Sequence, residues 1–406
     1  MSRLAGDSDA GKADASRPLI AHVVFRFDYG GLENGLVNLI NRMPEERFRH
    51  SVVALTEATA FRDRLQRPDV EVHALGKRPG KDPRAYWQLY RLLRRLKPAV
   101  LHTRNIGTLD CALLGRAAGI RACVHGEHGW DTHDPDGTSR KYRRLRRLMC
   151  PLVSRFITVS QDLRQWLIEP VGVPAGKITR ICNGVDTERF HPCSIGERAP
   201  ELAERFGTQR VIVGSVLRFN EIKDPLNLVR AFIVARREAK KQGMSPALVM
   251  VGDGPLREAA IAALNAAGVS DACWLPGRRD DVPAIMRSLD LFVLGSRREG
   301  ISNTVLEAMA SGLPAIATET GGNRELVTPE TGTLVRTEDS AALAEAILRY
   351  ARDPVLRHRQ GGAAREAATA QYSLRAMVDG YRQVYEDLAG PAPRRPKRHG
   401  HYAAEH

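Results

Sequence analysis

Two carboxylates eight positions apart, Glu299 and Glu307, have the setting that most strongly suggests chemistry. An apolar segment before them predicts a strand, and the chain then turns at Gly300 into a helix capped by Ser302 or Asn303. The first N–H groups of a helix favour phosphate. One carboxylate above such a site and one below it suits a ligand with hydroxyls on both sides of a diphosphate, such as a sugar nucleotide. Two solvated glutamates would show the same spacing, which is weak support alone.

Two cations, Arg218 and Lys223, follow the predicted strand 211–217. Ligand sites of α/β proteins lie just beyond the carboxyl ends of the strands. Fixed cations at that place would offset the charge that develops when a nucleoside diphosphate leaves. Taken alone, an arginine and a lysine in an exposed loop explain the same two residues.

Three further strand ends carry candidates, namely Gly30-Gly31, His128 and the turn that contains Gly254. Glycine allows backbone to approach a ligand closely, although a simple turn also explains a bare Gly-Gly. The pair lacks the third glycine of a dinucleotide fingerprint. A histidine at a strand end hydrogen-bonds a sugar hydroxyl, moves a proton near neutral pH, or is satisfied by local backbone. Nothing at ligand spacing predicts a metal site.

The scaffold that must position these residues is predicted by alternating strand-like and amphipathic helical runs, the pattern of parallel sheets wrapped by helices. The predicted strands are 20–25, 49–55, 70–75, 99–103, 122–127, 156–160 and 178–182, followed by 211–217, 247–251, 272–275, 290–294, 314–318 and 332–335. The sequence therefore predicts an α/β protein of two Rossmann-like, doubly wound domains that face a cleft.

Domain boundaries are expected where this alternation starts, lapses and ends. The expected parts are a disordered leader at 1–17, an N-terminal domain at 18–190, a linker at 191–200, a C-terminal domain at 201–372, a helix at 373–390 that crosses back to the N-terminal domain, and a disordered basic tail at 391–406. No apolar run approaches the roughly 20 residues of a membrane span, and the leader lacks the apolar centre of a signal peptide. Six scattered cysteines favour a reduced, cytoplasmic compartment.

The stretch from Glu299 to Pro314 resembles the donor-binding signature of retaining glycosyltransferases of family four (glycosyl transferases group 1), which have the GT-B fold. The resemblance covers about residues 18–390. Within the family, the chain resembles enzymes of bacterial exopolysaccharide or capsule assembly. Two departures stand out. Ile301-Ser302 replaces the usual Phe-Gly, and Asp224 replaces the usual glycine after Lys223.

The resemblance implies a nucleoside diphosphate sugar as donor and a hydroxyl of a lipid-linked saccharide or polysaccharide precursor as acceptor. It implies that the N-terminal domain binds the acceptor and the C-terminal domain the donor, with no metal and no cofactor. The catalytic residues that it implies are Glu299, His128, Arg218 and Lys223. The donor-binding residues that it implies are Gly30, Gly31, Arg218, Lys223, Gly254, Arg278, Glu299, Gly300, Ile301, Ser302, Asn303, Thr304 and Glu307.

For the reaction we prefer front-face attack, in which the donor phosphate takes the acceptor proton. A double displacement with Glu299 as nucleophile is the alternative, but this carboxylate is expected over the sugar hydroxyls and not beneath the anomeric carbon. Two other functions stay open at this point. A sugar-nucleotide 2-epimerase of the same fold would need no acceptor, and a non-catalytic, membrane-associated binding subunit would hold a sugar nucleotide without turnover.

The net charge of +14 calls for a partner or a solvated surface. The densest basic segment, Arg140–Arg147, predicts an amphipathic helix with a very basic outer face and an apolar stripe that includes Leu148 or Met149. A second basic helix is expected at 84–97. Both suit the anionic inner face of a membrane, and an ordinary solvated helix explains them equally well. Nucleic acid is disfavoured because no aromatic-interleaved basic platform is present.

Overall fold

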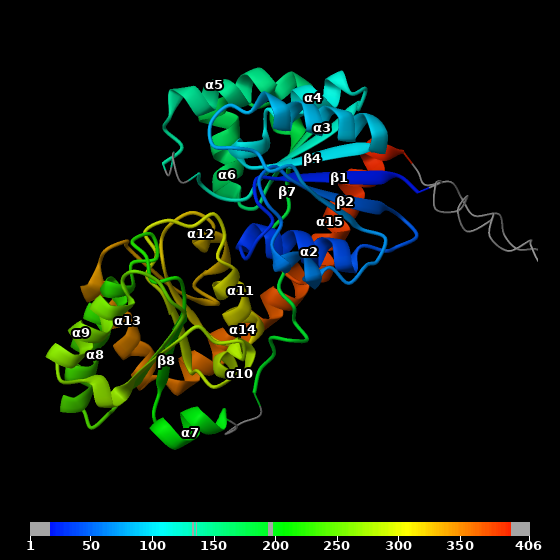
Figure 1. The fold of residues 1–406 in the computed structure, drawn as a ribbon. Coiled ribbons are helices and arrows are strands. Elements are labelled where there is room, and N and C mark those ends of the chain that lie inside the picture. Colours follow the sequence, from blue (N-terminus) through cyan, green and yellow to red (C-terminus); the bar gives the residue numbers. More distant parts are fainter. Residues whose placement is uncertain (1–16, 132–133, 135, 194–197, 391–406) are drawn as a thin grey trace, which may run out of the picture.

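A computed structural model describes residues 17–131, 134, 136–193 and 198–390 as two α/β domains, each built on a parallel sheet (Figure 1). The first sheet has seven strands in the order β3-β2-β1-β4-β5-β6-β7. They are β1 (Leu19–Val24), β2 (Arg49–Ala54), β3 (Glu71–Ala74), β4 (Val100–Arg104), β5 (Ala122–Glu127), β6 (Arg155–Thr158) and β7 (Ile178–Arg180).

The second sheet has six strands in the order β10-β9-β8-β11-β12-β13. They are β8 (Ile212–Val216), β9 (Ala247–Val251), β10 (Cys273–Gly277), β11 (Leu291–Leu294), β12 (Ala315–Thr318) and β13 (Gly332–Val335). Each strand lies within two residues of its predicted bounds, so the predicted α/β fold class is confirmed. The pattern was readable because strands covered on both faces are continuous apolar runs, as in β9, where all five side chains are buried.

Helices cover both faces of each sheet, and in the first domain the alternation of side chains along β1 shows which helix lies where. Ala21 and Val23 pack with α3 (Pro83–Leu96) and α4 (Cys111–Ala117), whereas Ile20 packs with α2 (Gly31–Arg42) and α15 (Leu374–Ala389). The remaining helices are α5 (Arg140–Met149), α6 (Gln161–Trp166), α7 (Pro200–Phe206), α8 (Pro225–Lys241), α9 (Arg257–Ala266), α10 (Val282–Arg287), α11 (Asn303–Ala310), α12 (Asn323–Leu326), α13 (Ser340–Arg352) and α14 (Pro354–Gln371).

The last helix, α15, follows the second domain along the chain but packs on the first sheet (Figure 1). Its start is tied to the end of the first domain, where Val185 donates to Tyr372 O at 2.8 Å and accepts from Leu374 N at 3.0 Å. Farther along, the Tyr385 hydroxyl lies 2.7 Å from Nδ1 of His102 on β4. The helix thus connects the second domain back to the first.

Helix α5 forms where the basic segment predicts it, but one of its cations does not lie on the outer face. Arg146 is buried, and its Nε donates to the buried carboxylate of Glu127 at 2.5 Å. Burial opposes ionisation of Glu127, but Arg146 and His125 together hold the pKa of that carboxyl well below its usual range. The structure also decides which of the two residues belongs to the apolar stripe of this helix. Met149 is in the core, and Leu148 is exposed. No helix in the described part of the chain combines the length and apolar character needed to cross a bilayer.

Candidate active site

Both sheets place their candidate residues at a topological switch point, the place where strand order reverses and where open α/β sheets bind ligands. In the first sheet β1 and β4 flank that point, and Gly30-Gly31 follows β1. In the second sheet β8 and β11 flank it. Arg218 and Lys223 follow β8, and Glu299 follows β11. The order of strands, and not sequence proximity, therefore brings these residues to one cleft.

The Glu299 carboxylate is buried and held from two directions. Its Oε1 accepts from Lys223 Nζ at 2.5 Å and from Ser296 Oγ at 2.6 Å, and the residue is only 7% exposed. Ser296 lies just beyond β11, so one side chain comes from each strand of the switch point. This arrangement fixes the orientation of the carboxylate before any ligand binds.

Gly300 lies in a space that leaves no room for a side chain. A Cβ on Gly300 would lie 2.7 Å from Cα of Gly129 and 3.2 Å from O of His128, both in the first domain. Beneath it, Gly322 N donates to Gly300 O at 3.1 Å, and a Cβ on Gly321 would lie 1.8 Å from Glu299 O. The loop that carries Glu299 is thus enclosed between two backbones, one of them across the cleft.

Polar contacts extend this junction between the domains on both sides of Gly300. Asn183 Nδ2 donates to Asn303 Oδ1 at 2.8 Å, and Arg180 Nη1 donates to Glu325 Oε2 at 2.8 Å. Arg298 forms an ion pair with Asp136. The two domains are therefore in contact along the cleft, which is the arrangement in which groups of both could act on one ligand.

Two helix N-termini meet at the cleft. Ser302 is the N-cap of α11, since its Oγ accepts from Val305 N at 3.3 Å, which confirms the predicted cap. Helix α2 starts after Gly30, and a Cβ on Gly31 would lie 3.2 Å from Nδ2 of Asn303. Because N–H groups and helix dipoles of both helices converge there, an anion such as a diphosphate is favoured.

A carboxylate of the first domain lies at the start of α2. Glu33 folds back so that its Oε2 is 2.1 Å from where a Cβ of Gly30 would be, which explains the glycine at this position. Burial raises the pKa of Glu33, and the nearby cations Arg104 and Arg218 act in the opposite direction. Arg218, itself exposed, is therefore close enough to the first domain to act on Glu33.

Glu307 lines a cavity of about 100 Å³ between the domains. The cavity is bordered by α2, the segment after β7 and α11; its lining includes Gly31, Asn183 and Asn303. Burial raises the pKa of Glu307 to about 7, and Arg189 lowers it only in part. A carboxylate in this position is able to accept from a pair of ligand hydroxyls, which would relieve its desolvation.

Glu307→Gln is expected to stabilise the unliganded protein by about 2 kcal/mol at pH 8 and by little at pH 5. The folded form keeps a proton on Glu307 up to about pH 7, whereas the ordinary pKa is 4.5. The free energy of unfolding therefore falls as the pH rises through that window, and glutamine removes the loss. Urea unfolding of both proteins at both pH values measures this difference in the free energy of unfolding. Glu345→Gln, at an exposed position of α13, is the control, and an equal gain at both pH values would contradict the assignment.

The ring of His128 lies at the end of β5 and lines a small cavity with Gly31 and Asn183. A Cβ on Gly126 would lie 2.5 Å from His128 Nε2, so the ring folds over the end of β5, and that nitrogen is buried without a hydrogen-bond partner among the described residues. Asn105 Oδ1 accepts from His128 N at 2.8 Å and holds the loop. Burial, and then Arg104, lower the pKa of His128 to about 3, so the ring is neutral at physiological pH. Its backbone oxygen lies beside the Gly300 loop.

The structure places the other predicted donor-binding residues at the helix cap, in the core, in a turn and at an exposed position after β10. Ile301 is buried in the core of the second domain, and Thr304 Oγ1 lies 3.3 Å from Ser302 Oγ at the helix cap. Gly254 has φ 149°, and a Cβ there would lie 2.5 Å from Phe219 O, so a turn requires glycine. Arg278 follows β10, two strands outside the switch point, with 88% of its side chain exposed.

Three residues outside the predicted set of site residues also shape this site. Ser296 is an ordinary serine after a strand, Asn183 belongs to an Asn-Gly turn, and Arg104 ends β4. Arg104 is buried beneath the cleft, where its guanidinium lies 3.2 Å from His22 Nδ1 and 3.3 Å from His102 Nδ1. The available signal was that all three lie at or just beyond the end of a strand.

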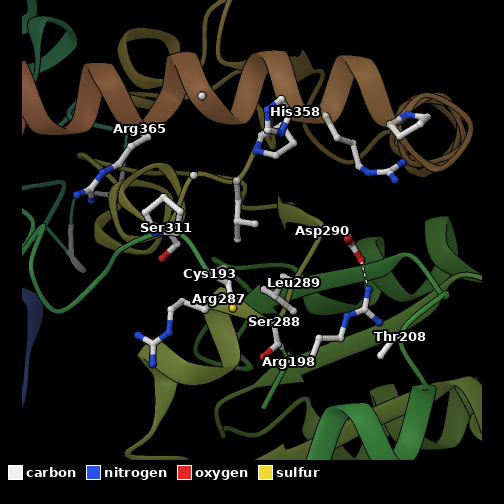
Figure 2. Close-up of a pocket in the computed structure, with 17 residues that line it drawn as sticks. Cys193, Arg198, Thr208, Arg287, Ser288, Leu289, Asp290, Ser311, His358 and Arg365 are labelled. Carbon is white, nitrogen blue, oxygen red and sulfur yellow. Dashed lines mark hydrogen bonds and ion pairs between the residues drawn. The ribbon is translucent and has the colours of Figure 1, made fainter. Parts of the chain in front are cut away.

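A larger cavity, of about 600 Å³, lies at the other end of the second domain, against the linker and α14 (Figure 2). Its arginines bind protein groups. Arg365 donates to the carbonyls of Phe190, Thr187 and Ala310, and Arg198 donates to Asp290 Oδ2 at 2.8 Å. This region anchors the linker. Within the described ranges, no three His, Cys, Asp or Glu side chains gather closely enough to hold a metal ion.

Two family signatures match the chain in succession. Residues 29–189 match glycosyltransferase family 4, and residues 209–353 match glycosyl transferases group 1. The chain is 30% identical over 317 residues to the putative glycosyltransferase EpsD of Bacillus subtilis, covering 73% of this chain and 80% of EpsD. The chain belongs to this family of GT-B glycosyltransferases.

Further similarities agree with this assignment. A UDP-Gal:alpha-D-GlcNAc-diphosphoundecaprenol alpha-1,3-galactosyltransferase of Escherichia coli is 28% identical over 315 residues, 76% of this chain and 80% of its own length. The crystal structure of Anabaena HepE, in complex with UDP and glucose, superposes with a TM-score of 0.76 at 20% identity, over 92% of this chain and 100% of HepE. The family assignment does not favour the epimerase or the non-catalytic subunit.

Proposed function

We propose that the protein transfers a sugar, with retention of anomeric configuration, from a nucleoside diphosphate sugar to a hydroxyl of a lipid-linked saccharide in bacterial polysaccharide synthesis. The observation that carries the proposal is the Lys223–Glu299–Ser296 cluster, which lies at the switch point of the second sheet, close to two helix N-termini. The E. coli relative supports the acceptor class, because its name specifies a diphosphoundecaprenol-linked sugar and an alpha linkage.

The roles that we assign follow from charge and position. The N-termini of α2 and α11, with Arg218 and Lys223, stabilise the departing diphosphate, and this fixed positive charge makes a metal unnecessary. Glu307 accepts from the ribose hydroxyls. Glu299 orients the sugar hydroxyls, which suits a carboxylate whose Oε1 is already engaged by Lys223 and Ser296. The donor phosphate takes the acceptor proton in a front-face attack.

Binding of the donor nucleotide is tested by thermal-shift titration of the full chain with UDP, GDP, ADP and CMP. A ligand that binds only the folded state raises the melting temperature. We expect UDP to raise it by several degrees, because UDP occupies HepE and UDP-Gal is named for the E. coli relative. A shift with GDP alone would change the donor class. If none of the four raises the melting temperature at millimolar concentration, the donor-site assignment is wrong.

A further inference from the structure

Three neighbouring helices of the first domain, α3, α4 and α5, form one continuous outer surface, which we call the α3–α5 face. Tyr86 of α3 donates to Asp110, the N-cap of α4, at 2.6 Å. Ala112 of α4 and Met149 of α5 share one buried apolar cluster. Figure 1 shows the face on the side of the first domain that is turned away from the second domain. It is therefore separate from the cleft and from the junction between the domains.

The charge of the α3–α5 face has a single sign. None of the three helices contains Asp or Glu, although the chain as a whole has 61 basic and 47 acidic residues. Overall composition therefore does not account for the absence of acids. The exposed cations that these helices present are Arg84, Arg91, Arg94, Arg95, Arg116, Arg140, Lys141, Arg144 and Arg147. Such a surface attracts an extended anionic partner.

Each of the three helices also exposes one large apolar side chain. Trp87 of α3 is 57% exposed, Leu113 of α4 is 48% exposed, and Leu148 of α5 is 69% exposed. Each is one turn from a cation on its own helix, and the Arg91 guanidinium carbon lies 4.7 Å from the centre of the Trp87 ring. Three of the eight large apolar side chains that are exposed among the described residues therefore lie on this one face.

We propose that the α3–α5 face docks on an anionic lipid bilayer, with its apolar side chains entering the headgroup region and its cations contacting lipid phosphates. Exposed leucine and tryptophan among Arg and Lys fit the boundary between headgroups and acyl chains. Nucleic acid is the weaker fit, because two of the three apolar side chains are aliphatic and have no ring for a base to stack on. This inference goes beyond glycosyl transfer and does not depend on it.

The test is co-sedimentation of the full chain with vesicles, without any nucleotide. The vesicles are pure phosphatidylcholine, or phosphatidylcholine with one third phosphatidylglycerol. The variant Arg94→Gln/Arg116→Gln/Arg144→Gln removes one cation from each helix of the face. The control Arg230→Gln/Arg237→Gln/Lys240→Gln removes three exposed cations from α8 in the second domain, with the same change in net charge.

We expect the wild type and the control to bind anionic vesicles and not neutral ones. The face variant should partition about a hundredfold more weakly, because each cation near an anionic surface contributes roughly fivefold. Leu148→Ser should weaken binding further without changing net charge, which separates insertion from charge attraction. Equal binding by the face variant and the control would overturn the proposal. Duplex DNA that displaces the protein from vesicles at equal phosphate concentration would overturn the choice of lipid.

Discussion

Glu299→Ala is expected to lower the rate of sugar transfer by about 10³-fold while UDP still binds. The wild-type carboxylate is held by Lys223 and Ser296, so the direction of its other oxygen is fixed, and in the proposed site that oxygen accepts from the sugar hydroxyls. Alanine removes a hydrogen-bond acceptor that acts on the sugar hydroxyls and leaves Lys223 without this partner. In the proposed site the diphosphate is bound by other groups, namely the two helix N-termini and Arg218, so nucleotide affinity should change by less than tenfold. Steady-state transfer and a UDP thermal shift measure the two quantities.

Two further variants show whether the carboxylate or its position matters. Glu299→Gln keeps the shape and still accepts from Lys223, so a large loss in this variant assigns the effect to the charge. Ser296→Ala removes one hydrogen bond and should cost about tenfold at most. Wild-type turnover of Glu299→Ala would contradict the role of this residue. A loss of UDP binding equal to the loss of transfer would assign Glu299 to nucleotide binding.

Gly300→Ala is expected to lower transfer about a hundredfold without unfolding either domain. Its added Cβ would lie 2.7 Å from Cα of Gly129 in the first domain, which is closer than carbon atoms approach. Gly300 is not in the left-handed region, so alanine adds no backbone strain there. The clash lies between domains, and they must separate to relieve it. A displacement of about 1 Å between catalytic groups and substrate costs about a hundredfold in rate.

The comparison for this variant is Gly362→Ala, in the interior of α14, where an added Cβ meets nothing within 4 Å. This control should keep full activity and gain a little stability, because alanine is the better helix residue. Equal melting temperatures for Gly300→Ala and the wild type, with a large loss of transfer, would support closure of the domains during turnover. Full activity of Gly300→Ala would show that this contact is not needed for the reaction.

Much of the architecture was predictable from the sequence because it depends on short-range physics. Strands such as β1, β9 and β11 are runs of mostly apolar residues with every side chain buried, and a window of about six residues is enough to find them. The start of α11 follows from a side chain that caps its own helix, Ser302. The order of strand, glycine turn and helix around Glu299 and Glu307 is likewise predicted by a short stretch of sequence. These features determined the fold class and most of the candidate site.

Only the tertiary structure decided which of these residues touch. Lys223 and Glu299 are 76 positions apart, and Asn183 and Asn303 are 120 apart. Their contacts depend on strand order and on how the domains meet, which no local pattern records. The same is true of Arg146, which a helical period places on a basic outer face but which the buried Glu127 draws inward. A buried charge needs a partner, and the partner's position is a property of the assembled fold.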